Sequence, residues 1–336
     1  MLQTHQYQKL IKAAKFALLL IISLFIIYKL VYRYKINKLF QQFSVSEHLN
    51  SYLFLTAALI LLIFNWGLES VKWQRLINKY EPLTLAASFK AVLSGVCLSI
   101  ITPNQIGDFA GRVIHLQTLN KIKGSLVTVI GHTAQVLITC FFGLFALWNL
   151  LIVVQNKGIL FPENIDWSIH LIEKANSFYT YFLPILFILL VVLSTWVYLN
   201  LQSVYLYFKR YTWVLKLEKY VQVFEAYSPR ELFVILGISF VRYLVFLLQY
   251  YLLLVFFDVQ IEPLYAFCCI IATFCVQSVV PSFFLLEIGL RGASALWFFG
   301  MFSNQTPGIL MAAYSLWIIN MMLPALLGMW FIYKVK

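Results

Sequence analysis

Two acid and arginine pairs stand inside an otherwise strongly apolar chain. Asp108 and Arg112 lie four residues apart in SIITPNQIGDFAGRVIHL, and Glu287 and Arg291 repeat this spacing in SVVPSFFLLEIGLRGASAL. A spacing of four places both side chains on one face of a helix, where they can neutralise each other. An arginine can also bind phosphate through two parallel hydrogen bonds. The pairs are therefore either internal ion pairs that let short helices enter a membrane or parts of a phosphate site.

Further candidate residues accompany these pairs. Arg242 lies within an apolar segment, and we expect it to pair with Glu287 or Asp108 or to join a phosphate site. The secondary candidates, which we interpret chiefly as hydrogen-bonding residues between helices, are His132, Gln135 and Gln277. Prolines and glycines are expected to shape the chain around the pairs, namely Pro103, Gly107, Gly111, Pro281, Gly289 and Gly292. Close helix packing and close approach of a ligand account equally well for these glycines.

The sequence carries no motif for a metal, a cofactor or a nucleophile. Its five cysteines lie in apolar segments without metal-ligand spacing. It has neither a P-loop nor a serine, histidine and aspartate order with a nucleophile elbow. We therefore expect no cofactor, no metal and no enzymatic reaction by this chain.

Composition places these residues in a membrane protein. Of 336 residues, 62% are hydrophobic and 11% are charged, whereas a soluble domain is about 45–50% apolar and about a quarter charged. Lipid offers no hydrogen-bond partners to the backbone, and the apolar runs are long and unbroken, so the spans are expected to be helices. The net charge of +12 is distributed between apolar segments, which favours an anionic membrane surface over nucleic acid. The predicted fold class is all-α, a polytopic integral membrane helical bundle.

Six apolar runs are long enough to cross a bilayer, which takes about 20 residues. The expected full transmembrane helices are 14–32, 51–70, 126–154, 180–201, 232–257 and 308–333. Two other regions, 84–112 and 263–302, contain shorter apolar runs interrupted by proline and charge. We expect a broken or re-entrant hairpin in each, buried in protein or lining a wet cavity.

The charge distribution predicts how these segments are oriented. Lysine and arginine gather in 202–231, at the carboxyl terminus and in the 112–124 link, so we expect all three on the cytoplasmic side. The region around Lys72, Arg75 and Lys79 then falls on the same side. The first hairpin then enters from the cytoplasm and the second from outside, which is the inverted-repeat plan of many transporters. One membrane domain is expected, with an amino-terminal span and connector, a first repeat, a linking region and a second, inverted repeat: 1–50, 51–154, 155–231 and 232–336.

The stretches SIITPNQIGDFAGRVIHL and VPSFFLLEIGLRGASALWFFG resemble the flippase-like integral membrane family that includes the membrane half of bacterial lysylphosphatidylglycerol synthases. The resemblance covers roughly 50–333 and implies a lipid-handling protein of the bacterial cytoplasmic (inner) membrane. The positions that match the family pattern are Pro103, Gly107, Asp108, Arg112, Pro281, Glu287 and Gly289. No soluble aminoacyl-transferase domain follows residue 336, so lipid synthesis by this chain alone is not expected.

These observations predict a membrane transporter or flippase-like protein for an anionic phospholipid or lipid-linked headgroup. Arg112, Arg291 and Arg242 would bind the lipid phosphate, while Asp108 and Glu287 would balance charge or couple to protons. The alternatives are a membrane-embedded enzyme or subunit of lipid or polyprenyl-linked glycan synthesis, and a scaffold for a separate synthase. The expected partners are anionic membrane phospholipids and a separate lipid- or glycan-synthesis enzyme, with no nucleic acid.

Overall fold

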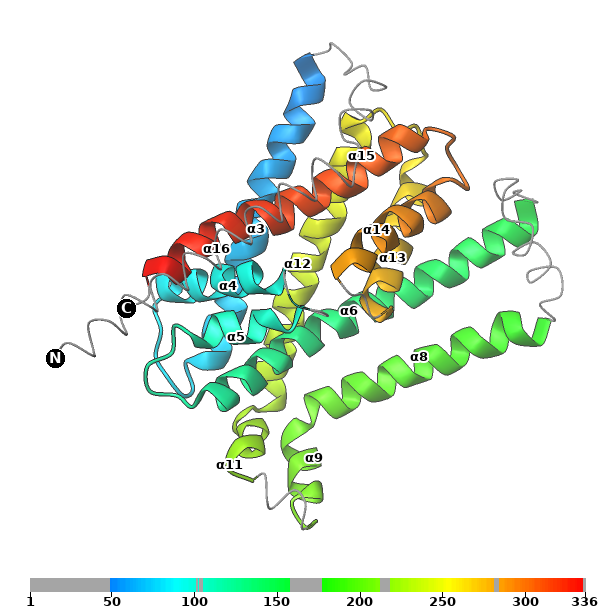
Figure 1. The fold of residues 1–336 in the computed structure, drawn as a ribbon. Helices are drawn as coiled ribbons and strands as arrows, with labels where there is room; N and C mark the ends of the chain where they lie inside the picture. Colours follow the sequence, from blue (N-terminus) through cyan, green and yellow to red (C-terminus); the bar gives the residue numbers. More distant parts are fainter. Residues whose placement is uncertain are drawn as a thin grey trace.

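The structure is a computed structural model that describes residues 49–100, 102, 105–157, 177–211, 218–280 and 284–334 (Figure 1). Every regular element within these ranges is a helix, which confirms the all-α prediction. The helices long and apolar enough to cross a membrane are Tyr52–Ile77, Lys121–Val153, Pro229–Phe256 and Thr306–Lys334. A bent pair, Ile185–Leu199 and Leu201–Phe208, meets at 81° and adds a fifth crossing if it is counted as one span. The expected span 14–32 lies outside the described residues.

A series of one long helix, two shorter helices and another long helix occurs twice among the described elements. These elements are α3 (Leu49–Ile77), α4 (Leu85–Ser99), α5 (Gly107–Val113), α6 (Lys121–Lys157), α8 (Ser177–Leu199), α9 (Leu201–Phe208), α11 (Glu218–Val221), the 3-10 helix η3 (Gln222–Ala226), α12 (Pro229–Phe256), α13 (Pro263–Val279), α14 (Phe284–Phe299), α15 (Thr306–Trp317), the π-helical turn η4 (Ile318–Met322) and α16 (Leu323–Lys334). The first series is α3 to α6, and the second is α12 to α16, in which α15, η4 and α16 together form the last long helix. The short helices α4, α5, α13 and α14 occupy the two regions in which the sequence predicts hairpins.

The long helices α3 and α12 pack against each other in opposite directions at the centre of the molecule (Figure 1). The rings of Tyr52 and Phe256 are in contact near one end of the pair, and Lys79 forms an ion pair with Glu231 near the other. A capping box of Ser228 and Glu231 starts α12, because each side chain accepts a hydrogen bond from the backbone N–H of the other residue. This antiparallel register decides which polar residues of the two helices meet.

Helices α4 and α5 form the first hairpin, and glycines bring them close together. A methyl group at Gly107 would overlap the carbonyl group of Leu98, and one at Gly111 would overlap that of Ser94. Gln105 in the connection has a φ of 57°, in the left-handed region that few residues other than glycine adopt. Close helix packing therefore explains both glycines, and Pro103 lies outside the described residues.

The connection between α5 and α6 is fixed by the carboxylate of Glu81. It accepts hydrogen bonds from the backbone N–H groups of Gln117, Thr118 and Leu119 at 2.8, 2.9 and 2.9 Å. Burial raises the pKa of the Glu81 carboxyl, but these three donors outweigh burial and hold the pKa below its ordinary value. The charged carboxylate thus satisfies backbone donors that precede the first turn of α6.

Helices α13 and α14 form the second hairpin, beside α6 and α15 (Figure 1). A methyl group at Gly292 would overlap the hydroxyl group of Tyr314 on α15, so this glycine serves close packing. At Gly289 a methyl group would meet no atom of the described residues within 4 Å. Packing therefore requires a glycine at only one of these two positions, and Pro281 lies outside the described residues.

The last span, α15 to α16, is a rod interrupted by the π-helical turn η4. Pro324 follows this turn and lacks the backbone N–H that would bond to the carbonyl of Asn320 in a regular α-helix. Such π turns occur mostly as single turns inside α-helices and frequently at functional sites. Here the turn carries the buried side chain of Asn320 toward α3 and α12.

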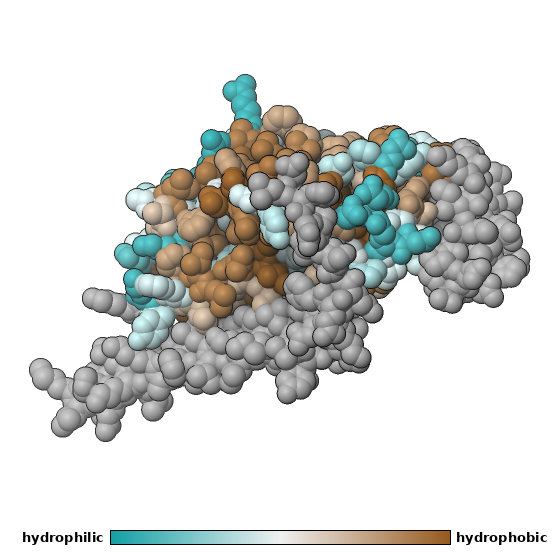
Figure 2. Space-filling model, turned by 90° about the horizontal axis from the view of Figure 1, so that it is seen from above, coloured by the Kyte–Doolittle hydropathy of each residue, from teal (hydrophilic) through white to brown (hydrophobic). Residues whose placement is uncertain are grey.

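The outer surface is rich in large apolar side chains. Figure 2 shows hydrophobic residues over the centre of one face and hydrophilic residues gathered toward its sides. Exposed examples on the long helices are Leu53, Ile63, Phe145, Leu189, Trp196, Phe233 and Leu327. Together with the long apolar helices, this surface is that of a multi-pass membrane protein.

Candidate functional site

A cavity of about 500 Å³ lies between the two hairpins and the central pair of helices. Its lining comes from α3, α4, α5, α6, α12, α13, α14, α15 and η4. Asp108 and Arg112 line it from the first hairpin, and Glu287 and Arg291 line it from the second. The fold thus brings together two pairs that are far apart in the sequence.

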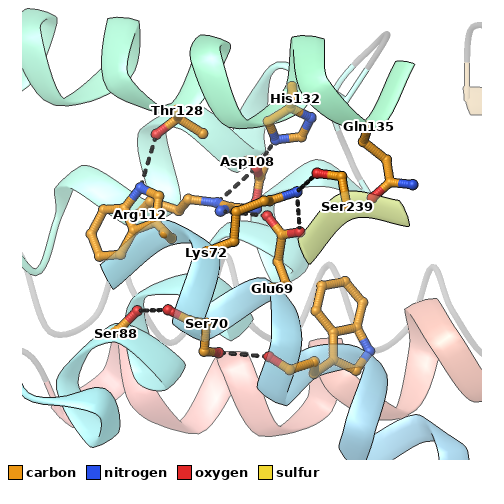
Figure 3. Close-up of polar contacts among 12 residues, drawn as sticks. Glu69, Ser70, Lys72, Ser88, Asp108, Arg112, Thr128, His132, Gln135 and Ser239 are labelled. Carbon is orange, nitrogen blue, oxygen red and sulfur yellow. Dashed lines mark hydrogen bonds and ion pairs between the residues drawn. The ribbon is translucent and has the colours of Figure 1, made fainter. Parts of the chain in front are cut away.

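One buried carboxylate, that of Glu69 on α3, contacts cations from three helices. Its Oε2 lies 2.7 Å from Nζ of Lys72 and 3.1 Å from Nη1 of Arg242. Its Oε1 accepts a hydrogen bond of 2.9 Å from Nη1 of Arg112. The Glu69 side chain is only 3% exposed, and Figure 3 shows its carboxylate directed toward Lys72. Burying a charge in this way requires close partners, which these three cations supply.

Asp108 joins the same group of charges. Its Oδ2 lies 2.8 Å from Nε of Arg112 and 2.6 Å from Nε2 of His132 on α6 (Figure 3). Arg112 is therefore shared between the carboxylates of Asp108 and Glu69, and its side chain is 4% exposed. The side chain of His132, by contrast, is 37% exposed and lines the cavity. We call these residues, Glu69, Lys72, Asp108, Arg112, His132 and Arg242, the first cluster.

The expected pairing of Arg242 with Asp108 or Glu287 is wrong. Its Nη1 pairs instead with Glu69, and its Nε donates a hydrogen bond of 2.7 Å to Oδ1 of Asn65. Both partners lie on α3, which runs antiparallel to α12 and presents them at the depth of Arg242. Arg242 is paired, as buried charges in membrane proteins usually are, but its partner depends on helix register.

One side of Arg242 faces the cavity among aromatic rings. The guanidinium carbon lies 5.2 Å from the ring centre of Trp66 and 5.1 Å from that of Phe246. Its Nη1 also lies 3.3 Å from Oε1 of Gln135. Trp66 and Tyr243 also line the cavity, and the buried indole N–H and hydroxyl group of these residues have no hydrogen-bond partner among the described residues. Most buried polar groups in proteins have a hydrogen-bond partner, so these two donors stand out beside the cavity.

A chain of buried amides connects Arg242 to the last span. Asn65 accepts from Arg242 and donates to Oδ1 of Asn320 at 2.8 Å. Asn320 in turn donates to Oε1 of Gln249 at 2.8 Å, and Gln249 donates to the carbonyl of Ala58 at 2.7 Å. These hydrogen bonds tie α3, α12 and η4 together behind the cavity.

The second hairpin holds a smaller group, the second cluster, made of Gln277, Glu287, Arg291 and Ser294. Oε1 of Glu287 accepts from Nη2 of Arg291 at 2.8 Å, and the two side chains are 19% and 18% exposed. Gln277 on α13 accepts from Nη1 of Arg291 at 3.3 Å and donates to Ser294 at 3.0 Å. The secondary candidates His132, Gln135 and Gln277 therefore each form a hydrogen bond to another helix.

Sequence reasoning missed Glu69 and misplaced Lys72. The expectation that Lys72 lies in a cytoplasmic connection is wrong, because it lies within α3, is 1% exposed and pairs with Glu69. The expected span ended at residue 70, where charges begin, whereas α3 continues to Ile77. The available signal was the spacing of three between Glu69 and Lys72, which places opposite charges on one helix face.

The cavity wall combines charge with apolar surface. Its fixed charges are those of Lys72, Arg112, Arg242, Arg291, Glu69, Asp108 and Glu287. These four cations and three carboxylates leave one positive charge unbalanced when His132 is neutral. Val136, Val279 and Val280 also line the cavity and are 44%, 63% and 43% exposed. Within the described ranges, no three histidine, cysteine or carboxylate side chains are grouped to hold a metal ion.

Comparison with known proteins bears on the whole chain. No curated protein and no solved structure matches it. The family model described as the lysylphosphatidylglycerol synthase TM region matches residues 16–328. This match includes both hairpins and every charged residue of the cavity. The chain therefore belongs to the family of the lysylphosphatidylglycerol synthase transmembrane region.

Proposed function

We propose that this protein is a membrane transporter or flippase-like protein that takes the phosphate group of an anionic phospholipid into the cavity between its hairpins. The observation that carries the proposal is a single cavity with an excess of positive charge and an exposed apolar rim. Charged residues within membrane proteins are costly and usually mark pathways. A lipid requires both features, because its phosphate needs cations and its acyl chains need an apolar route.

The cations of the cavity are suited to different tasks. Arg112 and Lys72 are almost fully buried against carboxylates, so they hold the protein together. Arg242 and Arg291 are more exposed to the cavity, at 11% and 18% of the side chain. We assign phosphate binding chiefly to these two arginines, with the indole N–H of Trp66 as an additional donor.

The apolar rim supplies a route for the acyl chains. Val136 lies on α6, while Val279 and Val280 lie at the end of α13, and all three border the cavity at the protein surface. The antiparallel α3 and α12 each begin a series of long, short, short and long helices. This arrangement supports an inverted repeat in which the two hairpins give alternating access to a central site.

The same proposal includes a location. We place the protein in the bacterial cytoplasmic membrane with its carboxyl terminus on the cytoplasmic side. Supporting features are basic residues next to aromatic rings at helix ends, where membrane interfaces favour such residues. Lys334 lies 4.5 Å from the ring centre of Trp330, and Arg210 lies 3.8 Å from that of Tyr207.

Lipid movement in vesicles tests this function. Purified protein would be reconstituted with fluorescent phosphatidylglycerol or phosphatidylcholine, and the label reaching the other leaflet would be followed by chemical quenching. We expect phosphatidylglycerol to move faster, and Arg242→Lys to slow it roughly ten- to hundred-fold, because the loss of charge-assisted hydrogen bonds costs about 1.5–3 kcal/mol. Arg230→Lys is the matched control, since Arg230 is exposed at the start of the same helix. Equal rates for both lipids, or no movement above empty vesicles, would contradict the proposal.

A further inference from the structure

We propose that the pair His132 and Asp108 is a proton-binding site coupled to the lipid site, so that protonation of His132 tightens binding of the lipid phosphate. This inference rests on the proposed function of the cavity. It adds the proton as a second ligand, and it names His132 as the residue through which pH would change the affinity for the lipid.

The geometry identifies the nitrogen that gains the proton. Nε2 of His132 lies 2.6 Å from Oδ2 of Asp108, which also forms an ion pair with Nε of Arg112. Since this carboxylate is an acceptor, Nε2 must carry a hydrogen in both states of the imidazole. The proton is therefore gained and lost at Nδ1, which has no hydrogen-bond partner among the described residues.

The position of His132 exposes its charge to a ligand. Its side chain is 37% exposed at the cavity wall, whereas that of Asp108 is 5% exposed. The ring of Phe109 packs 5.3 Å from the imidazole and covers part of it. Because Arg112 already pairs with Asp108, a positive charge on His132 is not fully balanced by the protein itself.

Charges from every packed element contribute to this balance. The charged groups around His132 are Glu69 and Lys72 on α3, Asp108 and Arg112 on α5, and Arg242 on α12, with Glu287 and Arg291 of α14 across the cavity. Protonation of His132 raises the excess charge of the cavity from one to two. An anion in the cavity then favours the protonated imidazole, and by thermodynamic linkage the proton favours the anion to the same extent.

A second histidine provides a matched control. His115 lies just after α5, and its Nε2 is 2.8 Å from Oγ of Ser94. It does not line the cavity. Replacing it by glutamine therefore removes a titrating group near the same hairpin without changing the charge that faces the lipid.

The experiment measures lipid affinity at two pH values. Short-chain phosphatidylglycerol and phosphatidylcholine would be titrated into the full chain in detergent by calorimetry, at about pH 5.5 and about pH 8, the range in which histidine titrates. The phosphodiester keeps one negative charge throughout, so a change in affinity arises from the protein. We expect phosphatidylglycerol to bind on the order of ten-fold more tightly at the lower pH, with proton uptake. His132→Gln keeps an N–H donor for Asp108 and should abolish this difference, whereas His115→Gln should retain it.

Each outcome decides a separate question. An affinity of the wild-type protein that does not change with pH, or a pH dependence that persists in His132→Gln, overturns the proton site and leaves the lipid site standing. Lack of preference for phosphatidylglycerol at both pH values overturns the proposed function itself. If His132→Gln does not fold, the test is proton uptake by the wild-type protein on lipid binding. It is measured by calorimetry in two buffers of different ionisation enthalpy. Binding without proton uptake then overturns the inference.

Discussion

The two hairpins carry the same acid and arginine spacing but hold it differently. In the first hairpin, the side chains of Asp108 and Arg112 are 5% and 4% exposed, and Arg112 also binds Glu69 on α3. In the second hairpin, the side chains of Glu287 and Arg291 are 19% and 18% exposed. The same local motif thus forms a buried network between helices in one half and a more open pair in the other.

Packing follows the same division. Gly111 lies directly against the backbone of α4, so the first hairpin is locked by close backbone contact. In the second hairpin, Gly289 has no described atom within 4 Å of an added methyl group, and Gly292 packs against a side chain, that of Tyr314, rather than against backbone. The hydrogen bonds of Arg291 also stay within its own hairpin, to Glu287 and Gln277. This difference predicts that the first hairpin anchors the cavity, while the second supplies the side that can rearrange around a ligand.

The largest expected contrast concerns the carboxylates. Glu69→Gln leaves Lys72, Arg112 and Arg242 with Asp108 as the one carboxylate of the first cluster, and loss of a buried ion-pair partner typically costs about 3–5 kcal/mol. Glu287→Gln removes one partner of a more open pair, for which we expect about 1 kcal/mol or less. Thermal unfolding of both variants in detergent measures the difference. Equal shifts in melting temperature would show that the two clusters contribute alike to stability.

A smaller contrast is expected at the glycines. Gly111→Ala inserts a methyl group against the carbonyl group of Ser94, and overpacking of this kind costs about 1–3 kcal/mol. Gly289→Ala meets open space, and alanine should stabilise an exposed helical position by up to about 1 kcal/mol. Opposite shifts in melting temperature are therefore expected. A loss of stability at Gly289→Ala as large as that at Gly111→Ala would remove the packing difference between the hairpins.

The fold class and the positions of both hairpins could be predicted because they depend on local properties. Apolar runs of sufficient length indicate membrane helices, and shorter runs interrupted by proline and charge indicate helices that do not cross. Helix ends were predicted less well. The apolar run predicts a helix end at residue 70, but Glu69 and Lys72 neutralise each other inside the protein and the helix continues to Ile77. Hydropathy alone cannot tell a paired buried charge from a charge in water.

The contacts of the candidate site also divide into those that local sequence specifies and those that it does not. The contacts of Asp108 with Arg112 and of Glu287 with Arg291 follow from a spacing of four in one helix. The contact of Glu69 with Arg242 depends on the antiparallel register of two helices distant in sequence, which no local pattern specifies. Sidedness in the membrane and the inverted repeat stay predictions for the same reason, because they concern relations between distant segments.

The finest contrast concerns the arginines, and it separates anchoring from ligand binding. Arg291→Lys keeps a cation in the second cluster, so we expect the free energy of unfolding to change by less than about 0.5 kcal/mol. Affinity for phosphatidylglycerol should fall roughly ten-fold, or about 1.4 kcal/mol, because lysine lacks the paired donors of the guanidinium group. Arg112→Lys should show the reverse pattern, with a clear loss of melting temperature and little change in affinity. A single ammonium group cannot bridge Asp108 and Glu69 in the way that Nε and Nη1 of Arg112 do. Both quantities can be measured on the same detergent preparations, by thermal unfolding and by lipid titration. If Arg291→Lys instead lowers the melting temperature and leaves affinity unchanged, the second hairpin is as structural as the first, and phosphate binding must be assigned to Arg242 alone.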